Sequence, residues 1–295
     1  MPPECNYVIM DGLHNLCKQA LQNDKLRRED VEKLSIVLRT VSLLASYEEE
    51  PKGLTQLLDK GLTNMILDIL VATLRCENDR ADSGVDQFLE DILEVIGAVS
   101  DYSTKAKSYV VETFCNTLLQ IVISVFVRFI TKMETLKTIN IILEGCPLYA
   151  REKMKASPVH KELMYEYTGS LYFLADYEFQ VGIIEALFRL SNRTDRETFA
   201  RGCFTNKDSL EAFFQIRDSD FETDCRRFLN ILNEKNTQKF RVISIPCRKA
   251  CLGDYELVKP ADTNYHEFWV DFNTGSKRIS LFCNPETPLS QVNIL

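Results

Sequence analysis

Two segments decide the fold of this chain: DYEFQVGIIEALFRL at residues 176–190 and SDFETDCRRFLNILN at residues 219–233. In the second segment, Ser219 and Glu222 have the spacing of a capping box, which satisfies two backbone amides at a helix start. The apolar residues recur at helical spacing on one stripe: Phe221, Cys225, Phe228, Leu229 and Leu232. The segment is therefore predicted to be a helix with one buried face.

The first segment is apolar around most of its circumference. Asp176 is its expected N-cap, and a narrow polar strip interrupts the apolar surface: Glu178, Glu185, Arg189 and Asn192. A helix this apolar is buried on more than one side, which predicts an inner helix of a layered, all-helical body. The strip supplies three candidate partner-binding residues, Glu178, Glu185 and Arg189.

The composition favours long helices. The chain has 295 residues with 45% hydrophobic content, enough for one large or two ordinary domains, and only 11 Gly and 9 Pro. The longest apolar run, residues 118–130, contains Gln120 and Arg128 and is shorter than the roughly 20 residues of a membrane span. We expect no membrane segment. The first residues lack the pattern of a secretory signal, so we expect an intracellular protein with reduced cysteines.

The net charge of −8 argues against a general electrostatic hold on nucleic acid. From Asn236 onward there are seven Lys and Arg against six Asp and Glu, which leaves 28 against 37 before it. The acidic excess therefore belongs to the helical part. Its expected partners are proteins, including basic ones.

Helical patterns continue along residues 1–235. Residues 61–70 resemble the glycine-led helix of armadillo repeats, in which Gly61 would permit a sharp turn before an apolar helix. Further helical segments are expected at residues 85–99, 108–130, 133–143 and 163–174, and two short helices within residues 193–216. Stacked helices of this kind form a continuous core and an extended surface, so we predict an armadillo-like helical domain over residues 1–235.

After residue 235 the pattern changes to short β-branched and aromatic runs, FRVISIP, YELVKP, EFWVDF and RISLF, which predict about four strands. WVDFNTGSKRISLF indicates a hairpin in which Trp269 and Phe272 are expected core anchors. Lys277 and Arg278 form a basic tip and are candidate contacts for a histone or nucleic acid. The apolar stripe of residues 219–233 is expected to seat these strands.

Together these segments resemble the N-terminal region of the synaptonemal complex protein 2 family. The resemblance rests on the two opening segments, on FRVISIPC at residues 240–247 and on EFWVDFNTGSKRISLFC at residues 267–283. It implies a mainly α protein: an armadillo-like α-solenoid followed by a pleckstrin-homology-like β domain related to the middle domain of Spt16. That β domain is expected to begin at residue 236 and to be present only as its first half.

The resemblance also implies a function. It points to a non-enzymatic scaffold of the meiotic chromosome axis, in the lateral element of the synaptonemal complex, located in the nucleus, with a role near centromeres as one option. Expected partners are chromosome-axis or centromere proteins. Family members assemble with synaptonemal complex protein 3 through a C-terminal coiled coil, and no heptad run of that kind occurs here. The alternative is a generic armadillo-type adaptor for a peptide or histone-like partner. The single Trp269 lies in the β region, which weighs against that alternative.

Signatures of catalysis and cofactor binding are absent from the sequence, including the phosphate-loop, dinucleotide, zinc-protease and serine-hydrolase motifs. Cys247 and Cys251 lack a second pair for zinc. We expect no enzyme activity, cofactor or metal. Arg226 and Arg227 have two interpretations: they recognise a partner's carboxylate or phosphate, or they pair within their helix with Glu222 and Asp224.

Overall fold

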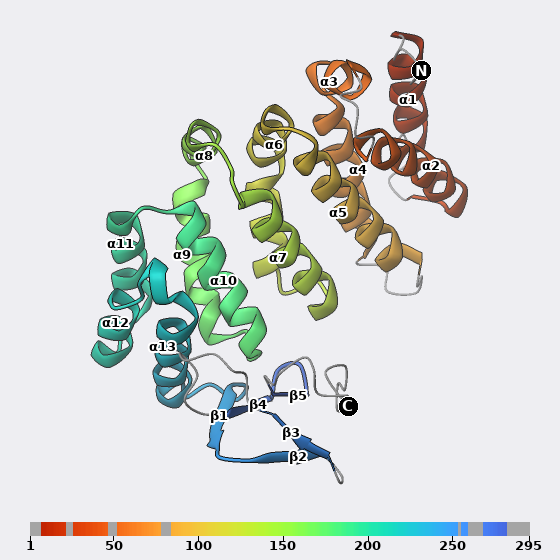
Figure 1. The fold of residues 1–295 in the computed structure, drawn as a ribbon. Helices are drawn as coiled ribbons and strands as arrows, with labels where there is room; N and C mark the ends of the chain where they lie inside the picture. Colours follow the sequence, from red (N-terminus) through yellow and green to blue (C-terminus); the bar gives the residue numbers. More distant parts are fainter. Residues whose placement is uncertain are drawn as a thin grey trace. The chain divides into compact units, whose positions relative to one another are not determined.

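The computed structural model describes residues 7–21, 26–46, 52–77, 84–252, 255–258 and 268–281. The chain divides into two compact units, Met1–Leu163 and Met164–Leu295. Helices fill the first unit, and the second combines helices with short strands (Figure 1).

Helix α5 lies at the centre of the first unit, where it packs against α2, α4, α6 and α7. Its buried residues follow the helical period and are apolar, as in Phe88, Ile92, Ile96 and Val99, apart from Ser100 near the end of the helix. The helices of this unit are α1 Tyr7–Ala20, α2 Arg28–Ala45, α3 Lys52–Asp59, α4 Leu62–Glu77, α5 Gly84–Tyr102, α6 Thr104–Ile123, α7 Phe129–Leu143 and α8 Leu148–Lys155, and α9 His160–Gly169 begins at its end.

The glycine-led turn predicted at Gly61 is confirmed. Gly61 has φ +91° between the end of α3 and the start of α4, a backbone conformation that costs a residue with a Cβ about 1 kcal/mol or more. The nearest atom to an added Cβ would be 3.7 Å away, on Asn64. The glycine is therefore required by the backbone angle and not by lack of space.

The helices of the second unit are α10 Tyr177–Leu190, α11 Arg193–Cys203, α12 Lys207–Phe214 and α13 Phe221–Lys235, with 3-10 turns at η1 Ser170–Tyr172 and η2 Asp218–Asp220. Asp176 caps α10 as predicted, since its Oδ1 accepts from the Phe179 amide at 3.1 Å. The predicted capping box at Ser219 is wrong. The turn η2 delays the helix start to Phe221, and the Ser219 hydroxyl donates to Asp220 instead.

Phenylalanine rings form the centre of the second unit's helical layer. Phe228 of α13 packs against Phe204 and Phe213, with centroids 5.4 and 5.2 Å apart, and Phe188 lies 5.9 Å from Phe213. Tilted and edge-to-face arrangements at these distances are favoured by the ring quadrupoles. Phe228 therefore packs on helices, and the expectation that the stripe seats the strands is wrong for this residue. Cys225 of the same stripe does lie at the strands, where it lines a pocket with Asp271.

The strands are β1 Val242–Cys247, β2 Ala250–Leu252, β3 Tyr255–Leu257, β4 Phe268–Asn273 and β5 Arg278–Leu281. They pair antiparallel in the order β1-β4-β5, with a separate β2-β3 pair. The register places Ile243, Phe272 and Ile279 side by side on one face, and each is exposed. Asp271 and Asn273 point to the opposite face, where both are buried. This sheet thus buries its polar face, and the prediction of Phe272 as a core anchor is wrong.

Candidate functional site

The seven residues predicted as partner-binding all lie in the second unit, at three places. Arg226 and Arg278 point into the contact between the helices and the sheet, and Lys277 lies beside them in the hairpin turn. Helix α10 carries three more of the seven residues, and Arg227 lies alone at a cleft near the start of α13.

Arg226 is held by the strand residue Asp271. The guanidinium donates to both carboxylate oxygens, Nη1 to Oδ1 at 2.8 Å and Nη2 to Oδ2 at 3.1 Å, and the side chains are 11% and 3% exposed. Ser244 also donates to Asp271 at 2.6 Å, and the guanidinium lies 3.5 Å from the Tyr177 ring centroid. The buried, bidentate partner of Arg226 is therefore Asp271 of strand β4, whereas the interpretation of pairing within the helix named Glu222.

Asp176 holds the hairpin turn as well as capping α10. Its Oδ2 accepts from Ser276 at 2.5 Å and from Arg278 at 3.1 Å, and the residue is 1% exposed. The amide of Gly275 donates to the Ala175 carbonyl at 3.1 Å, and a Cβ on Gly275 would stand only 2.9 Å from that of Ala175. The turn therefore rests directly on the start of α10. We name the whole contact between α10, α13 and the sheet the polar junction.

Buried amides complete the polar junction. Gln180 and Asn233 exchange two hydrogen bonds, at 3.0 and 2.8 Å, between α10 and α13. Asn273 of β4 accepts from the Tyr177 amide at 2.8 Å, and Asn236 donates to the Tyr172 carbonyl at 2.9 Å. Sequence reasoning missed these partners, although an Asp and an Asn alternating with Trp269 on one face of a strand were a readable signal.

The polar strip of α10 is only partly open. Glu185 and Arg189 form an i,i+4 ion pair at 2.8 Å, with side chains 37% and 29% exposed. Glu178 is exposed about two turns before Glu185 on the same helix. In the hairpin turn, Lys277 is exposed with φ +58°. These four residues and Arg227 are partly or fully exposed, and the Arg278 side chain is also 34% exposed although its Nη2 binds Asp176.

Four arginines and three phenylalanines line a cleft of about 620 Å³ in the second unit. We name it the arginine cleft. Arg193 and Arg196 come from α11, Arg217 precedes η2, and Arg227 lies on α13. The aromatic side chains are Phe188, Phe213 and Phe214, and the carboxylates are Glu197, Asp218 and Asp224.

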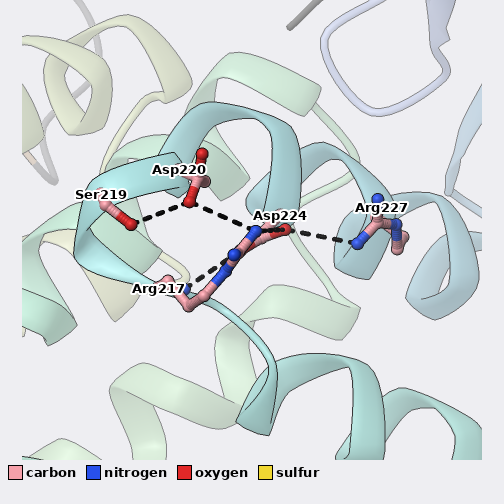
Figure 2. Close-up of polar contacts among 5 residues, drawn as sticks. All are labelled: Arg217, Ser219, Asp220, Asp224 and Arg227. Carbon is pink, nitrogen blue, oxygen red and sulfur yellow. Dashed lines mark hydrogen bonds and ion pairs between the residues drawn. The ribbon is translucent and has the colours of Figure 1, made fainter.

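Asp224 is the carboxylate that organises one wall of the arginine cleft, as Figure 2 shows. It is 3% exposed and accepts from the Arg217 amide at 3.2 Å, from the Arg217 Nε at 2.9 Å and from the Arg227 Nη1 at 3.3 Å. Burial alone would raise the pKa of Asp224, but the hydrogen bonds and charges of the two arginines outweigh it and hold that pKa below its usual value. The predicted pairing of Arg227 with Asp224 is confirmed.

Arg196 lies deeper in the arginine cleft. Its guanidinium stacks 3.9 Å from the Phe188 ring centroid and 3.9 Å from an oxygen of Asp218, with the side chain 16% exposed. Burial lowers the pKa of this guanidinium. Sequence reasoning did not single out Arg193, Arg196 or Arg217, because the first two lie on α11, at least 21 residues before Arg217, and only the fold brings them together.

Among the described residues, no group of three or more His, Cys, Asp or Glu side chains is arranged to hold a metal ion. In this same part of the chain, no helix is both long and apolar enough to cross a bilayer. Cys247 and Cys251 are free thiols on β1 and β2, which belong to different sheets.

Two domain families match the chain. The synaptonemal complex 2 armadillo-repeat-like domain matches residues 5–150, and the synaptonemal complex 2 Spt16M-like domain matches residues 242–293. A solved structure titled "Synaptonemal complex protein" aligns with a TM-score of 0.75 and 29% identity over 93% of this chain and 70% of that one.

Two longer relatives carry the name of the same family. Human synaptonemal complex protein 2 is 32% identical over 95% of this chain, and mouse synaptonemal complex protein 2-like is 31% identical over 98% of it. The chain spans only 18% of the human protein and 34% of the mouse protein.

Proposed function

The chain belongs to the synaptonemal complex protein 2 family, whose role in the meiotic synaptonemal complex is structural and non-enzymatic, and we propose that it is a protein-interaction module of the chromosome axis. It would act in the lateral element, in the nucleus, with chromosome-axis proteins as partners. We also propose an association with centromeres. The mechanism is binding, in which complementary charge sets specificity and buried apolar anchors supply most of the affinity.

The observation that carries this proposal is the presence of both family domains, in order, on one chain. We further propose a division into a helical domain of residues 1–235 and a β domain from residue 236. The change from helix to strand between Lys235 and Val242 supports this division.

The polar strip of α10 offers a direct test. Glu185→Lys and Arg189→Glu each break the ion pair and reverse one surface charge, whereas the double swap restores the pair with inverted polarity. In a crosslinking pull-down from meiotic nuclei, each single variant and the double variant should lose chromosome-axis partners. An unchanged partner set in the double variant, with the fold intact, would show that the pair is only structural.

A groove in the first unit favours the alternative, an adaptor for a basic peptide or a histone-like segment. It has a volume of about 560 Å³ between α5 and α7 and is lined by four carboxylates against one lysine: Glu90, Glu94, Asp101 and Glu134, with Lys137. A titration with a histone-tail peptide distinguishes the two functions. Saturable binding that is lost in Glu94→Gln would support the adaptor.

A further inference from the structure

The arginine cleft presents more guanidinium donors than its own carboxylates use. The side chains of Arg193, Arg217 and Arg227 are 80%, 64% and 58% exposed. A guanidinium carries five N–H donors in a planar fork, and Arg227 gives only Nη1 to Asp224. The other donor groups of Arg227 thus lie in an exposed side chain at the cleft.

Hydrogen bonds to Asp224 order the side chains of Arg217 and Arg227 before a ligand binds. Arg217 and Arg227 share the buried carboxylate of Asp224, and Arg217 also pairs with Asp220 at 3.2 Å (Figure 2). These contacts fix the two guanidiniums while both side chains stay more than half exposed. Ordering in advance lowers the entropy that the ligand must lose on binding, which favours recognition of an anionic group here.

Aromatic surface lies beside these donors. Phe188, Phe213 and Phe214 line the same cleft, and Arg201 stacks 4.8 Å from the Phe214 ring centroid. The cleft volume of about 620 Å³ falls in the range of roughly 300–1,000 Å³ that is usual for ligand pockets. The surface therefore suits a ligand that combines an anionic group with an apolar side chain.

We propose that the arginine cleft binds a segment of another protein in which a carboxylate or phosphate group lies next to an aromatic or aliphatic side chain. This inference rests on the proposed protein-interaction function and names the chemistry of one partner. Nucleic acid fits the cleft less well, because Asp218 and Glu197 line it and repel a repeating phosphate backbone. Asp218, 85% exposed, also competes with the ligand's anionic group.

The test is a fluorescence anisotropy titration of the full chain with four probes. They are a labelled peptide with two glutamates beside a phenylalanine, the same peptide with phosphoserine in place of one glutamate, the same peptide with both glutamates changed to glutamine, and a single-stranded DNA oligonucleotide. The glutamate and phosphoserine peptides should bind and the glutamine peptide should not. The stronger of the two binders identifies carboxylate or phosphate as the natural group.

Substitutions in the chain distinguish binding at the arginine cleft from non-specific electrostatic attraction. Arg227→Gln and Arg193→Gln should each raise the dissociation constant about tenfold, the usual effect of losing one hydrogen bond to a charged group. Asp218→Asn should lower the dissociation constant, because a competing carboxylate is removed. Lys207→Gln is the matched control, because Lys207 is 86% exposed in the same unit and does not line the cleft.

Three results would overturn the proposal: equal affinity for the glutamine peptide, an equal loss in Lys207→Gln, or tighter binding of the oligonucleotide than of either anionic peptide. The peptide titration does not depend on partners from meiotic nuclei. The peptide titration and the pull-down therefore distinguish an error in the proposal for the arginine cleft from an error in the proposed function.

Discussion

The first unit and the polar junction of the second unit hold their elements together in opposite ways. Helix α5 packs on its neighbours through side chains such as Ile92 and Ile96, both fully buried and apolar. At the polar junction, the equally buried residues are Asp176, Asp271 and Asn273. The first contact is non-directional, and the second depends on specific donors and acceptors.

The two kinds of contact lose stability in different ways when one side chain is substituted. Loss of a methyl group from an apolar core lowers stability in proportion to the surface and cavity involved. Removal of one member of a buried ion pair leaves an uncompensated charge, which costs about 3–5 kcal/mol. The polar junction should therefore be more sensitive to single changes than the α5 core, although it contains less apolar surface.

The largest effect is expected for Asp271→Ala. It would leave Arg226 buried without its bidentate partner and lower the free energy of unfolding by about 3–5 kcal/mol. Urea unfolding followed by the fluorescence of Trp269, the single tryptophan of the chain, reports on this site, because its ring lies 5.8 Å from the Arg226 guanidinium. A loss below about 1 kcal/mol would show that the junction is not held by this pair.

A smaller, pH-dependent effect is expected for Asp224→Asn. Because the folded-state pKa of Asp224 is held below its usual value of about 3.9, its contribution is present above that pH and is lost as the pH falls through the folded-state pKa. At neutral pH the loss should be about 2 kcal/mol, the size of a hydrogen bond to a charged group. The difference from the unsubstituted chain should shrink as the pH falls below about 4, and a constant difference would contradict the account.

A substitution in the apolar core around α5 provides the comparison with these polar sites. Ile96→Val removes one methylene group from a fully buried position and should lower the stability of the first unit by about 0.5–1.5 kcal/mol at any pH. Thermal unfolding at acid and neutral pH checks both statements. A strong pH dependence in this variant would remove the contrast between the two regions.

The smallest expected effect is a change in the rate at which cysteine thiols react with labelling reagents. Burial raises the pKa of Cys225 to about 12 and raises that of Cys115 as well, so both should resist thiol reagents, whereas exposed Cys251 should react. Asp271→Ala should increase the labelling rate of Cys225, which lies on α13 beside Arg226, and leave that of Cys115 unchanged. Equal acceleration at both cysteines would indicate general unfolding and not local opening.

The sequence was informative where local rules decide the structure. The cap at Asp176, the glycine turn at Gly61 and the Arg227–Asp224 pair follow from neighbours within a few residues, and all three are confirmed. The family and the fold class are confirmed by the domain matches.

Long-range partners could not be predicted in the same way. Arg226 had Glu222 four residues before it and Asp271 forty-five residues after it, and periodicity says nothing about which carboxylate the fold desolvates. The same reason explains the error over Phe228, whose stripe position showed burial but not whether helices or strands cover it. Whether the predicted surface residues bind a partner stays a prediction.

The most direct test of the polar junction is a double-mutant cycle on Arg226→Met and Asp271→Leu, measured by urea unfolding with Trp269 fluorescence. The Arg226 Nε is buried without a hydrogen-bond partner among the described residues, so a well-packed apolar pair should replace the ion pair at little cost. Each single variant should lose about 3–5 kcal/mol and the double variant far less, a coupling of at least about 2 kcal/mol. Additive losses, with coupling near zero, would contradict the claim that this buried pair holds the sheet to the helices.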